Sequence, residues 1–283
     1  MSSSISGADK VKIPYKSLVP FLLITFGLAW GIIALFIFLP EKMKELFGEL
    51  TGEYPLFFLA VYAPAISAFI VVIHYQGFLG FRHYLSRFLL WRCSTAWYAF
   101  IILVIPILFF SGSALKGNLF TESFPYSSFE TLGIALLIMA IKGPIEEFGW
   151  RGLALPLLQR KFAPLWAGLI LGIIWGFWHL PAFLLSGTPH GAWSFFPFFT
   201  GSVAVSVIVT QLFNASRGSI LLPAIMHFQL INPIWPDAQP YDTLFFVAAA
   251  AFVVWFNRKT MLSKEYAITE VIPYANNTKK PST

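Results

Sequence analysis

The stretch that decides the fold is residues 164–185, which read PLWAGLILGIIWGFWHLPAFLL. A helix of this length and apolar character is long enough to cross a bilayer core, which takes roughly 20 apolar residues. Seven other stretches come close to the same description, at 18–39, 55–75, 96–115, 131–158, 193–213, 219–231 and 243–256, of which 219–231 is short. We therefore predict an all-α, polytopic transmembrane helical bundle of about eight transmembrane helices, forming a single domain over residues 1–283.

Composition and charge placement agree with a membrane protein. The chain is 57% hydrophobic and 11% charged, whereas soluble domains are about 25% charged. If the N-terminus is cytoplasmic and each span reverses direction, the cytoplasmic segments hold 15 of the 19 Lys and Arg residues: Lys10, Lys12, Lys16, Arg82, Arg87, Arg92, Arg151, Arg160, Lys161, Arg217, Arg258, Lys259, Lys264, Lys279 and Lys280. The positive-inside rule then predicts a multi-pass cell-membrane protein with both termini, and the tail 260–283, in the cytoplasm. Topology accounts for the net charge of +6, so membrane lipid is an expected partner and nucleic acid is not.

Ionisable residues interrupt three of the apolar stretches. Residues 142–152 read KGPIEEFGWRG, and single histidines stand inside two later spans, at His179 and His227. A charged side chain near the centre of a membrane helix costs roughly 2.5–3.5 kcal/mol on insertion scales. Ionisable residues that are present inside membrane spans despite this cost indicate a functional site.

Helical spacing separates the two adjacent glutamates. Glu147 and Arg151 are four residues apart, acid before base, so they are expected to form an ion pair on one helix face. Glu146 points about 100° away from Glu147, which leaves it available for another role. Lys142, one turn before Glu146, is an alternative partner that would make Glu146 purely structural.

A second helix face is defined by small residues at four-residue spacing. Gly168, Gly172 and Gly176 let a neighbouring helix approach closely, and His179 and Trp175 lie on roughly the same face. His179 is therefore expected to point into a helix–helix contact and away from lipid. The remaining histidines, His74, His83 and His190, are expected at the surface.

These residues together resemble a known family, the CAAX protease and bacteriocin-processing family of intramembrane proteases, also called the Abi family. Glu146, Glu147 and Arg151 match its first motif, Trp175 and His179 match the second with Trp in place of the usual Phe, and His227 begins the third. The resemblance covers residues 131–232, which it marks as the motif-bearing catalytic core. One departure concerns the Asn that often follows the third-motif His by four residues. Here Asn232 stands one position later, so a supporting role for Asn232 is an open question.

Two mechanisms are compatible with this set of residues. In the first, Glu146 is the general base that activates water, and His179 and His227 orient the water or stabilise the intermediate. In the second, which the family's metalloprotease label implies, His179, His227 and one glutamate, such as Glu146, hold a divalent metal, zinc by preference. Glu147, Arg151, Trp175 and Asn232 then have supporting roles. Cys93 is the single cysteine, so no intramolecular disulfide or cysteine-based metal cluster is expected.

The family resemblance implies an intramembrane endopeptidase similar to type II CAAX prenyl endopeptidases. Its substrate would be a membrane-bound peptide or a lipidated protein, such as a CAAX-type tail or a precursor peptide. The alternative is a non-catalytic membrane protein, either an immunity or scaffold factor or a small-solute transporter. Transport is disfavoured because the spans of the first half of the chain contain no Asp, Glu, Lys or Arg, whereas transporters are commonly built from paired repeats.

Overall fold

The computed structural model describes residues 12–48, 55–120, 126–185 and 188–273. Within these ranges the chain is helical and contains no strand. The α-helices are α1 (Leu18–Phe38), α2 (Pro40–Phe47), α3 (Pro55–Val61), α4 (Ala63–Leu85), α5 (Thr95–Ala99), α6 (Ile105–Lys116), α7 (Phe129–Lys142), α8 (Glu146–Gly149), α9 (Leu155–Gln159), α10 (Pro164–Trp178), α11 (Pro189–Ala192), α12 (Phe195–Ala215), α13 (Leu221–Leu230), α14 (Asp242–Phe256) and α15 (Arg258–Met261). Shorter elements are η1 (Tyr15–Ser17), η2 (Ser86–Leu89), η5 (Leu180–Leu184), η6 (Lys264–Tyr266) and the π-helices η3 (Phe100–Val104) and η4 (Trp150–Ala154). The all-α prediction is confirmed.

Five helical runs among the described residues are long and apolar enough to cross a membrane. They are Tyr15–Phe38, Ala63–Leu89, Thr95–Lys116, Pro164–Leu184 and Phe195–Ala215. Two shorter apolar helices, Leu221–Leu230 and Asp242–Phe256, match two more of the predicted spans. The remaining predicted span, 131–158, is divided among α7, α8, η4 and α9, because Pro144 and Pro156 cannot donate the backbone hydrogen bonds of a continuous helix. The chain is a helical membrane protein, and the number eight stays a prediction.

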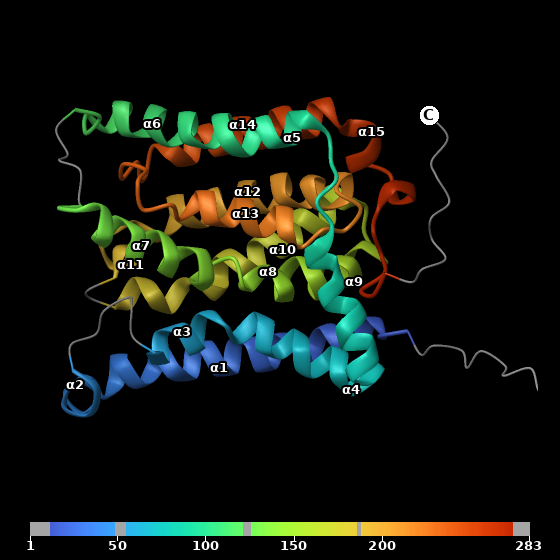
Figure 1. The fold of residues 1–283 in the computed structure, drawn as a ribbon, viewed down its shortest axis with the longest axis horizontal. Helices are drawn as coiled ribbons and strands as arrows, with labels where there is room; N and C mark the ends of the chain where they lie inside the picture. Colours follow the sequence, from blue (N-terminus) through green and yellow to red (C-terminus); the bar gives the residue numbers. More distant parts are fainter. Residues whose placement is uncertain (1–11, 49–54, 121–125, 186–187, 274–283) are drawn as a thin grey trace, which may run out of the picture.

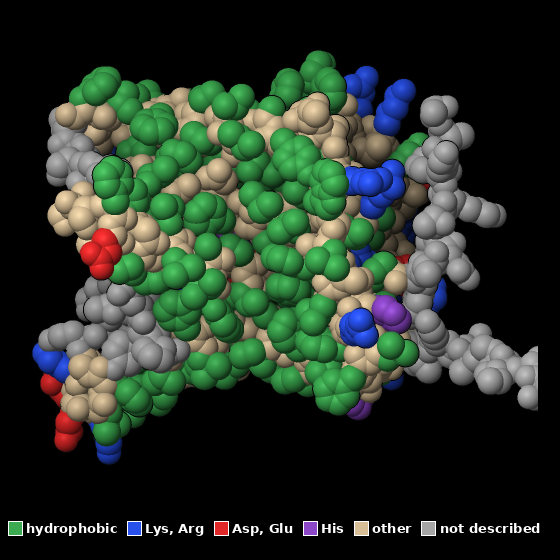
Figure 2. Space-filling model, in the orientation of Figure 1, with side chains coloured by type: hydrophobic (Ala, Val, Ile, Leu, Met, Phe, Trp, Pro, Cys, Tyr) green, Lys and Arg blue, Asp and Glu red, His purple; other side chains and the backbone are tan. Residues whose placement is uncertain are grey.

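The long helices lie side by side in three groups (Figure 1). The helices α1, α3 and α4 form one edge, α8–α10, α12 and α13 form the centre, and α5, α6 and α14 form the opposite edge. Every residue from Gly149 to Gln159 is buried. The outer surface carries many apolar side chains (Figure 2), such as Leu23, Phe78 and Trp255. An apolar exterior around a buried, motif-bearing centre is the arrangement that lipid solvation favours.

The predicted close contact at the glycine-rich face is confirmed. A Cβ atom added at Gly172 of α10 would lie 2.8 Å from the Cα of Val203, and one added at Gly168 would lie 2.8 Å from Thr210 Oγ1, both on α12. Gly176 lies equally close to α12, at the Phe199 ring. Backbone contact of this kind increases the van der Waals area between membrane helices, where the hydrophobic effect does not drive association.

Gly172→Ala is therefore expected to lower the free energy of unfolding by about 1–3 kcal/mol, because the added methyl must push α12 away. Gly31→Ala is the matched control, since Gly31 is also a helical glycine but nothing lies within 4 Å of its Cβ position. Alanine there should be neutral or stabilising by about 0.5–1 kcal/mol. Thermal unfolding of both variants in detergent measures the difference, and equal melting temperatures would contradict the packing argument.

One end of the bundle is held by the segment that follows η6. Arg87 is 1% exposed, and its guanidinium donates hydrogen bonds to the carbonyl oxygens of Val271 (2.9 Å), Gly218 (2.8 Å) and Glu270. Arg160 binds a carbonyl of the same segment at 3.0 Å. The described part of the predicted tail, up to residue 273, is thus packed on the bundle, while residues 274–283 lie outside the described residues. The prediction of a single domain with a core at 131–232 and a tail at 260–283 is not tested by these contacts.

Candidate active site

The glutamate pair lies just after an interruption between two helices. α7 ends at Lys142, Gly143 and Pro144 interrupt the helix, and α8 begins at Glu146. Gly143 allows close approach of α13, since a Cβ there would lie 2.9 Å from Nε2 of His227. The π-helix η4 follows α8 directly, and π-turns of this kind occur often at functional sites.

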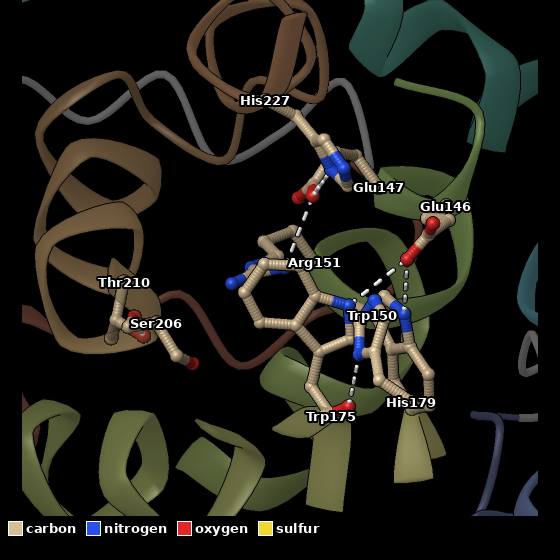
Figure 3. A network of polar contacts seen from close by, with 9 residues as sticks. All are labelled: Glu146, Glu147, Trp150, Arg151, Trp175, His179, Ser206, Thr210 and His227. Atoms are coloured by element: carbon tan, nitrogen blue, oxygen red, sulfur yellow. Dashed lines mark hydrogen bonds and ion pairs between the residues drawn. The ribbon is translucent and has the colours of Figure 1, made fainter. Parts of the chain in front are cut away.

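Glu146 is oriented by two indole rings. Its Oε2 accepts hydrogen bonds from Trp175 Nε1 at 2.9 Å and from Trp150 Nε1 at 3.3 Å, and the residue is 4% exposed. Figure 3 shows Glu146 reaching from α8 toward α10. Lys142, considered as an alternative partner, has its Nζ 4.8 Å from the centroid of the Phe57 ring. Two donors on one carboxylate oxygen fix the side chain and leave Oε1 for a ligand.

The predicted ion pair between Glu147 and Arg151 is confirmed. Arg151 Nη1 lies 3.0 Å from Glu147 Oε1, with both side chains at most 1% exposed. The same oxygen is 2.7 Å from His227 Nδ1. The Arg151 guanidinium also lies over the Trp175 ring, 4.9 Å from its centroid. Glu147 therefore binds both the arginine of its own helix and a histidine 80 residues later in the chain.

Both histidines make their hydrogen bonds through Nδ1. His179 Nδ1 lies 2.8 Å from the carbonyl oxygen of Trp175, which can only accept, so Nδ1 carries the proton and Nε2 of the neutral ring has a lone pair. The Glu147 carboxylate imposes the same tautomer on His227. The Trp175 ring lies against both imidazoles, with centroid distances of 5.4 Å to His179 and 5.6 Å to His227. Trp175 thus contacts Glu146, His179 and His227 at once.

A cavity of about 480 Å³ brings these groups together. Its lining includes Glu146, Trp175, His179 and His227, and it is otherwise mainly apolar. Aromatic side chains contribute much of the wall: Phe57, Phe109, Trp178, Trp193, Phe198, Trp235 and Phe246. This volume lies in the usual range of small-ligand sites, about 300–1,000 Å³, and can accommodate several side chains of a peptide.

Two residues of the site were not found from the sequence. His190 was expected at the surface, but it is half-buried in α11, lines the cavity and stacks on His179 with ring centroids 5.7 Å apart. Trp150 was not considered, although its position four residues after Glu146 predicts a shared helix face. His74 and His83 are exposed, as predicted. The error at His190 has a tertiary cause, because α11 packs back onto η5 and places the His190 ring against His179, Phe183 and Phe198.

Asn232 lines the same cavity without contacting the other candidates. Its Nδ2 donates to Gln229 Oε1 at 2.9 Å, and its Oδ1 accepts from the backbone N–H of Ile234 at 3.2 Å. Since α13 ends at Leu230, Asn232 lies in the turn that follows the helix. It shapes the rim of the cavity, and its supporting role in catalysis stays a prediction.

The zinc hypothesis can be compared with this geometry. With Nδ1 engaged in each case, Nε2 is the ring nitrogen that either histidine could offer to a metal. A catalytic zinc site takes three protein ligands and one water, and the described residues contain no group of three or more His, Cys, Asp or Glu side chains arranged to hold a metal. Oε2 of Glu146 is also engaged by two indoles. The zinc hypothesis therefore stays a prediction, and no step below is assigned to a metal.

Elemental analysis of the purified protein separates the two mechanisms. The zinc hypothesis requires about one zinc ion per chain, which His227→Ala would remove, and cleavage that chelators abolish. The mechanism in which Glu146 acts as the general base without a metal instead predicts substoichiometric zinc and cleavage that persists after chelation. His74→Ala, at an exposed histidine, controls for metal bound adventitiously at the surface.

Comparison with known proteins gives two matches. The family model described as "Type II CAAX prenyl endopeptidase Rce1-like" matches residues 128–231. The chain is also similar to CAAX prenyl protease 2 of Methanococcus maripaludis, with 30% identity over 178 residues, which is 58% of this chain. The match spans 62% of the length of that relative. The family match begins at the cap of α7 and ends just after α13, so it contains all three motifs.

Fold and site together define a class: helical membrane proteins with a buried glutamate pair and two histidines facing an internal cavity. Within that class, the chain is similar to type II CAAX proteases over the residues that the two matches cover. Both matches agree with the family resemblance predicted from Glu146, Glu147, Arg151, Trp175, His179 and His227, and the roles of these residues stay predictions.

Proposed function

We propose that the chain is an intramembrane endopeptidase that hydrolyses a peptide bond in a membrane-associated substrate. The observation that carries the proposal is the Glu146 carboxylate, which two indoles hold at the wall of a cavity shared with His179 and His227. A site of this composition can bind one water between a carboxylate and an imidazole acceptor. The family matches support peptide hydrolysis as the reaction.

The proposed reaction uses only side chains that line the cavity. A water donates one hydrogen bond to Glu146 and the other to Nε2 of His179 or His227. Glu146 takes a proton as the water oxygen bonds to the substrate's carbonyl carbon, and returns it to the amide nitrogen as the C–N bond breaks. The products are a new carboxyl terminus and a new amino terminus.

Glu147 and Arg151 have a positioning role in this proposal. Glu147 holds His227 in the tautomer whose Nε2 accepts a hydrogen bond, and Arg151 compensates the charge of Glu147. In this proposal neither the Glu147 carboxylate nor the Arg151 guanidinium contacts the substrate. The arrangement parallels the use of a carboxylate to orient a histidine in other hydrolases.

The proposal is tested by comparing peptide termini in membranes from cells that produce the protein and from cells that do not. We expect termini that occur only with the protein, in substrates that are anchored to the membrane. Purified protein should then cleave a synthetic peptide that spans the mapped bond. If no such termini are found, or if the purified protein leaves the peptide intact, the chain is not the endopeptidase proposed.

A further inference from the structure

The cavity has a second polar wall, far from the glutamate pair in the sequence. It contains Asp237 and Gln239 of the connection between α13 and α14, and Asp242, the first residue of α14. This wall lies at the end of the bundle that carries α2, away from the basic end where α4 and α9 finish (Figure 1). Apolar side chains such as Phe109 and Phe246 line the cavity beside it. The proposed reaction assigns no role to the three polar residues.

Two acceptor atoms of this wall lack a donor among the described residues. Asp242 is 4% exposed, and its Oδ2 accepts a hydrogen bond from Gln239 Nε2 at 3.2 Å. Oδ1 of Asp242 and Oε1 of Gln239 are also buried, and they accept no hydrogen bond from the described part of the chain. Buried polar atoms of folded proteins are nearly always hydrogen-bonded. Two such atoms, on side chains that are bonded to each other, indicate that a ligand supplies the donors.

The charge of Asp242 has no paired cation within the described ranges. The charged groups that act on it are Asp237 and Lys116, and Lys116 Nζ lies 2.5 Å from Asp237 Oδ2. This lysine is thus already paired with the other carboxylate. Lys142 also lines the cavity, but its Nζ lies 4.8 Å from the centroid of the Phe57 ring of α3, at the opposite edge of the bundle from α14. A carboxylate in a mainly apolar wall is expensive to bury unless it is paired, so a cationic ligand fits this wall.

From the two acceptors and the unpaired charge, we propose that Asp242 and Gln239 form a subsite that binds a basic side chain, Lys or Arg, of the peptide substrate. This inference rests on the proposed endopeptidase function and names one determinant of its substrate. An ammonium or guanidinium group supplies several N–H donors and a positive charge together. A water molecule can donate to both acceptors, but it does not compensate the charge. The apolar stem of Lys or Arg also suits the apolar lining that surrounds the subsite.

The acceptors are held in place before a ligand binds. A Cβ atom added at Gly112 of α6 would lie 2.8 Å from the backbone nitrogen of Asp242, so α6 packs directly on the start of α14. The backbone N–H of Gln239 donates to Asp237 Oδ1 at 3.1 Å, and Lys116 holds the other oxygen of Asp237. A preorganised pair of acceptors loses little conformational entropy on binding. It can therefore distinguish a basic side chain from a neutral one of similar size.

A positional scan of the peptide that spans the mapped bond tests the subsite. Each residue in turn is replaced with Lys, Arg or Gln, and the amino terminus is acetylated so that no α-ammonium group competes for the acceptors. Purified full-length protein is assayed in detergent, and kcat/KM is measured for each peptide. At one position relative to the cleaved bond, Lys or Arg should give a kcat/KM about tenfold or more above that of Gln, as expected for hydrogen bonds between charged groups.

Variants of the wall show whether these residues cause the preference. Asp242→Asn removes the charge and keeps the shape of the side chain, so the ratio of kcat/KM between the Lys and Gln peptides should fall to about twofold or less. Gln239→Glu adds a second carboxylate at the same place and should raise the ratio above that of the wild type. Glu130→Gln is the matched control, because it removes one charge at an exposed position of α7. This control should keep the wild-type ratio.

The ratio is measured within each variant, so a general loss of activity does not imitate a loss of preference. Equal kcat/KM for Lys, Arg and Gln at every position would overturn the inference and leave the endopeptidase function standing. A preference that Asp242→Asn retains would do the same. If Asp242→Asn does not fold, an unchanged ratio in Gln239→Glu would overturn the inference instead. A wild-type protein that cleaves none of the peptides would contradict the endopeptidase function and this inference with it.

Discussion

Replacing Glu146 with glutamine is expected to lower the rate of substrate cleavage by about 10²–10⁴-fold, the usual contribution of a general base. Glutamine keeps the shape of the side chain, and its carbonyl oxygen can still accept from Trp175 and Trp150. The variant removes the group that takes the proton from water. Because the shape and the two hydrogen bonds of the side chain are kept, the folded protein should reach the membrane in normal amounts. The measurement is the initial rate on the peptide identified from the mapped termini.

Glu130→Gln is the matched control for this variant. Glu130 is an exposed glutamate of α7, in the same stretch of chain as Glu146. Its replacement removes the same charge without touching the cavity, and its rate should stay within about twofold of the wild type. Full cleavage by Glu146→Gln would show that another residue activates the water and would refute the assigned roles.

Arg151→Ala is expected to lower the free energy of unfolding by about 3–5 kcal/mol, because it leaves the Glu147 charge buried without its partner. The His227 imidazole, whose Nδ1 lies 2.7 Å from Glu147 Oε1, still contacts that carboxylate in the variant. The double variant Glu147→Gln with Arg151→Gln removes both charges, so it should lower the free energy of unfolding less than Arg151→Ala does. Thermal unfolding in detergent and the amount of folded protein in the membrane measure both effects.

The control for this prediction is an ion pair at the surface. Lys12 pairs with Glu270 at 2.9 Å, and its side chain is 66% exposed. Lys12→Ala should change stability by about 1 kcal/mol or less, because water screens an exposed pair. Equal stability of Arg151→Ala and the double variant would show that the buried charge on Glu147 is compensated elsewhere.

Local spacing was sufficient to predict several features of the site. The pair of Glu147 and Arg151 follows from the 3.6-residue helical period, which places positions four apart on one face. The tight contact at Gly172 follows from the absence of a Cβ on a regular face. The lengths of apolar runs likewise predicted four of the five long helical runs closely, because backbone groups in lipid must be satisfied within the helix itself. The fifth was predicted at 55–75, whereas the structure has it at Ala63–Leu89.

The environment of the reactive groups could not be derived in this way. The indole that orients Glu146 comes from Trp175, 29 residues later, and the imidazole that binds Glu147 comes from His227, 80 residues later. Helical periodicity assigns each residue a face, but it does not say which faces meet or at what depth. His190 was misplaced for this reason, since the stacking on His179 depends on how an irregular connection folds back.

The sequence by itself determined that this chain forms apolar helices in a membrane, which end of the bundle is basic, and which ionisable residues are kept inside it. These properties depend on the local cost of placing backbone and charge in lipid, so they can be calculated from neighbouring residues. Only the tertiary structure decided that Trp175 touches Glu146, His179 and His227, that His190 stacks on His179, and that their cavity lies away from the basic end. Those facts depend on how separate helices pack, because side-chain packing between distant segments selects one arrangement among many that the same apolar runs allow.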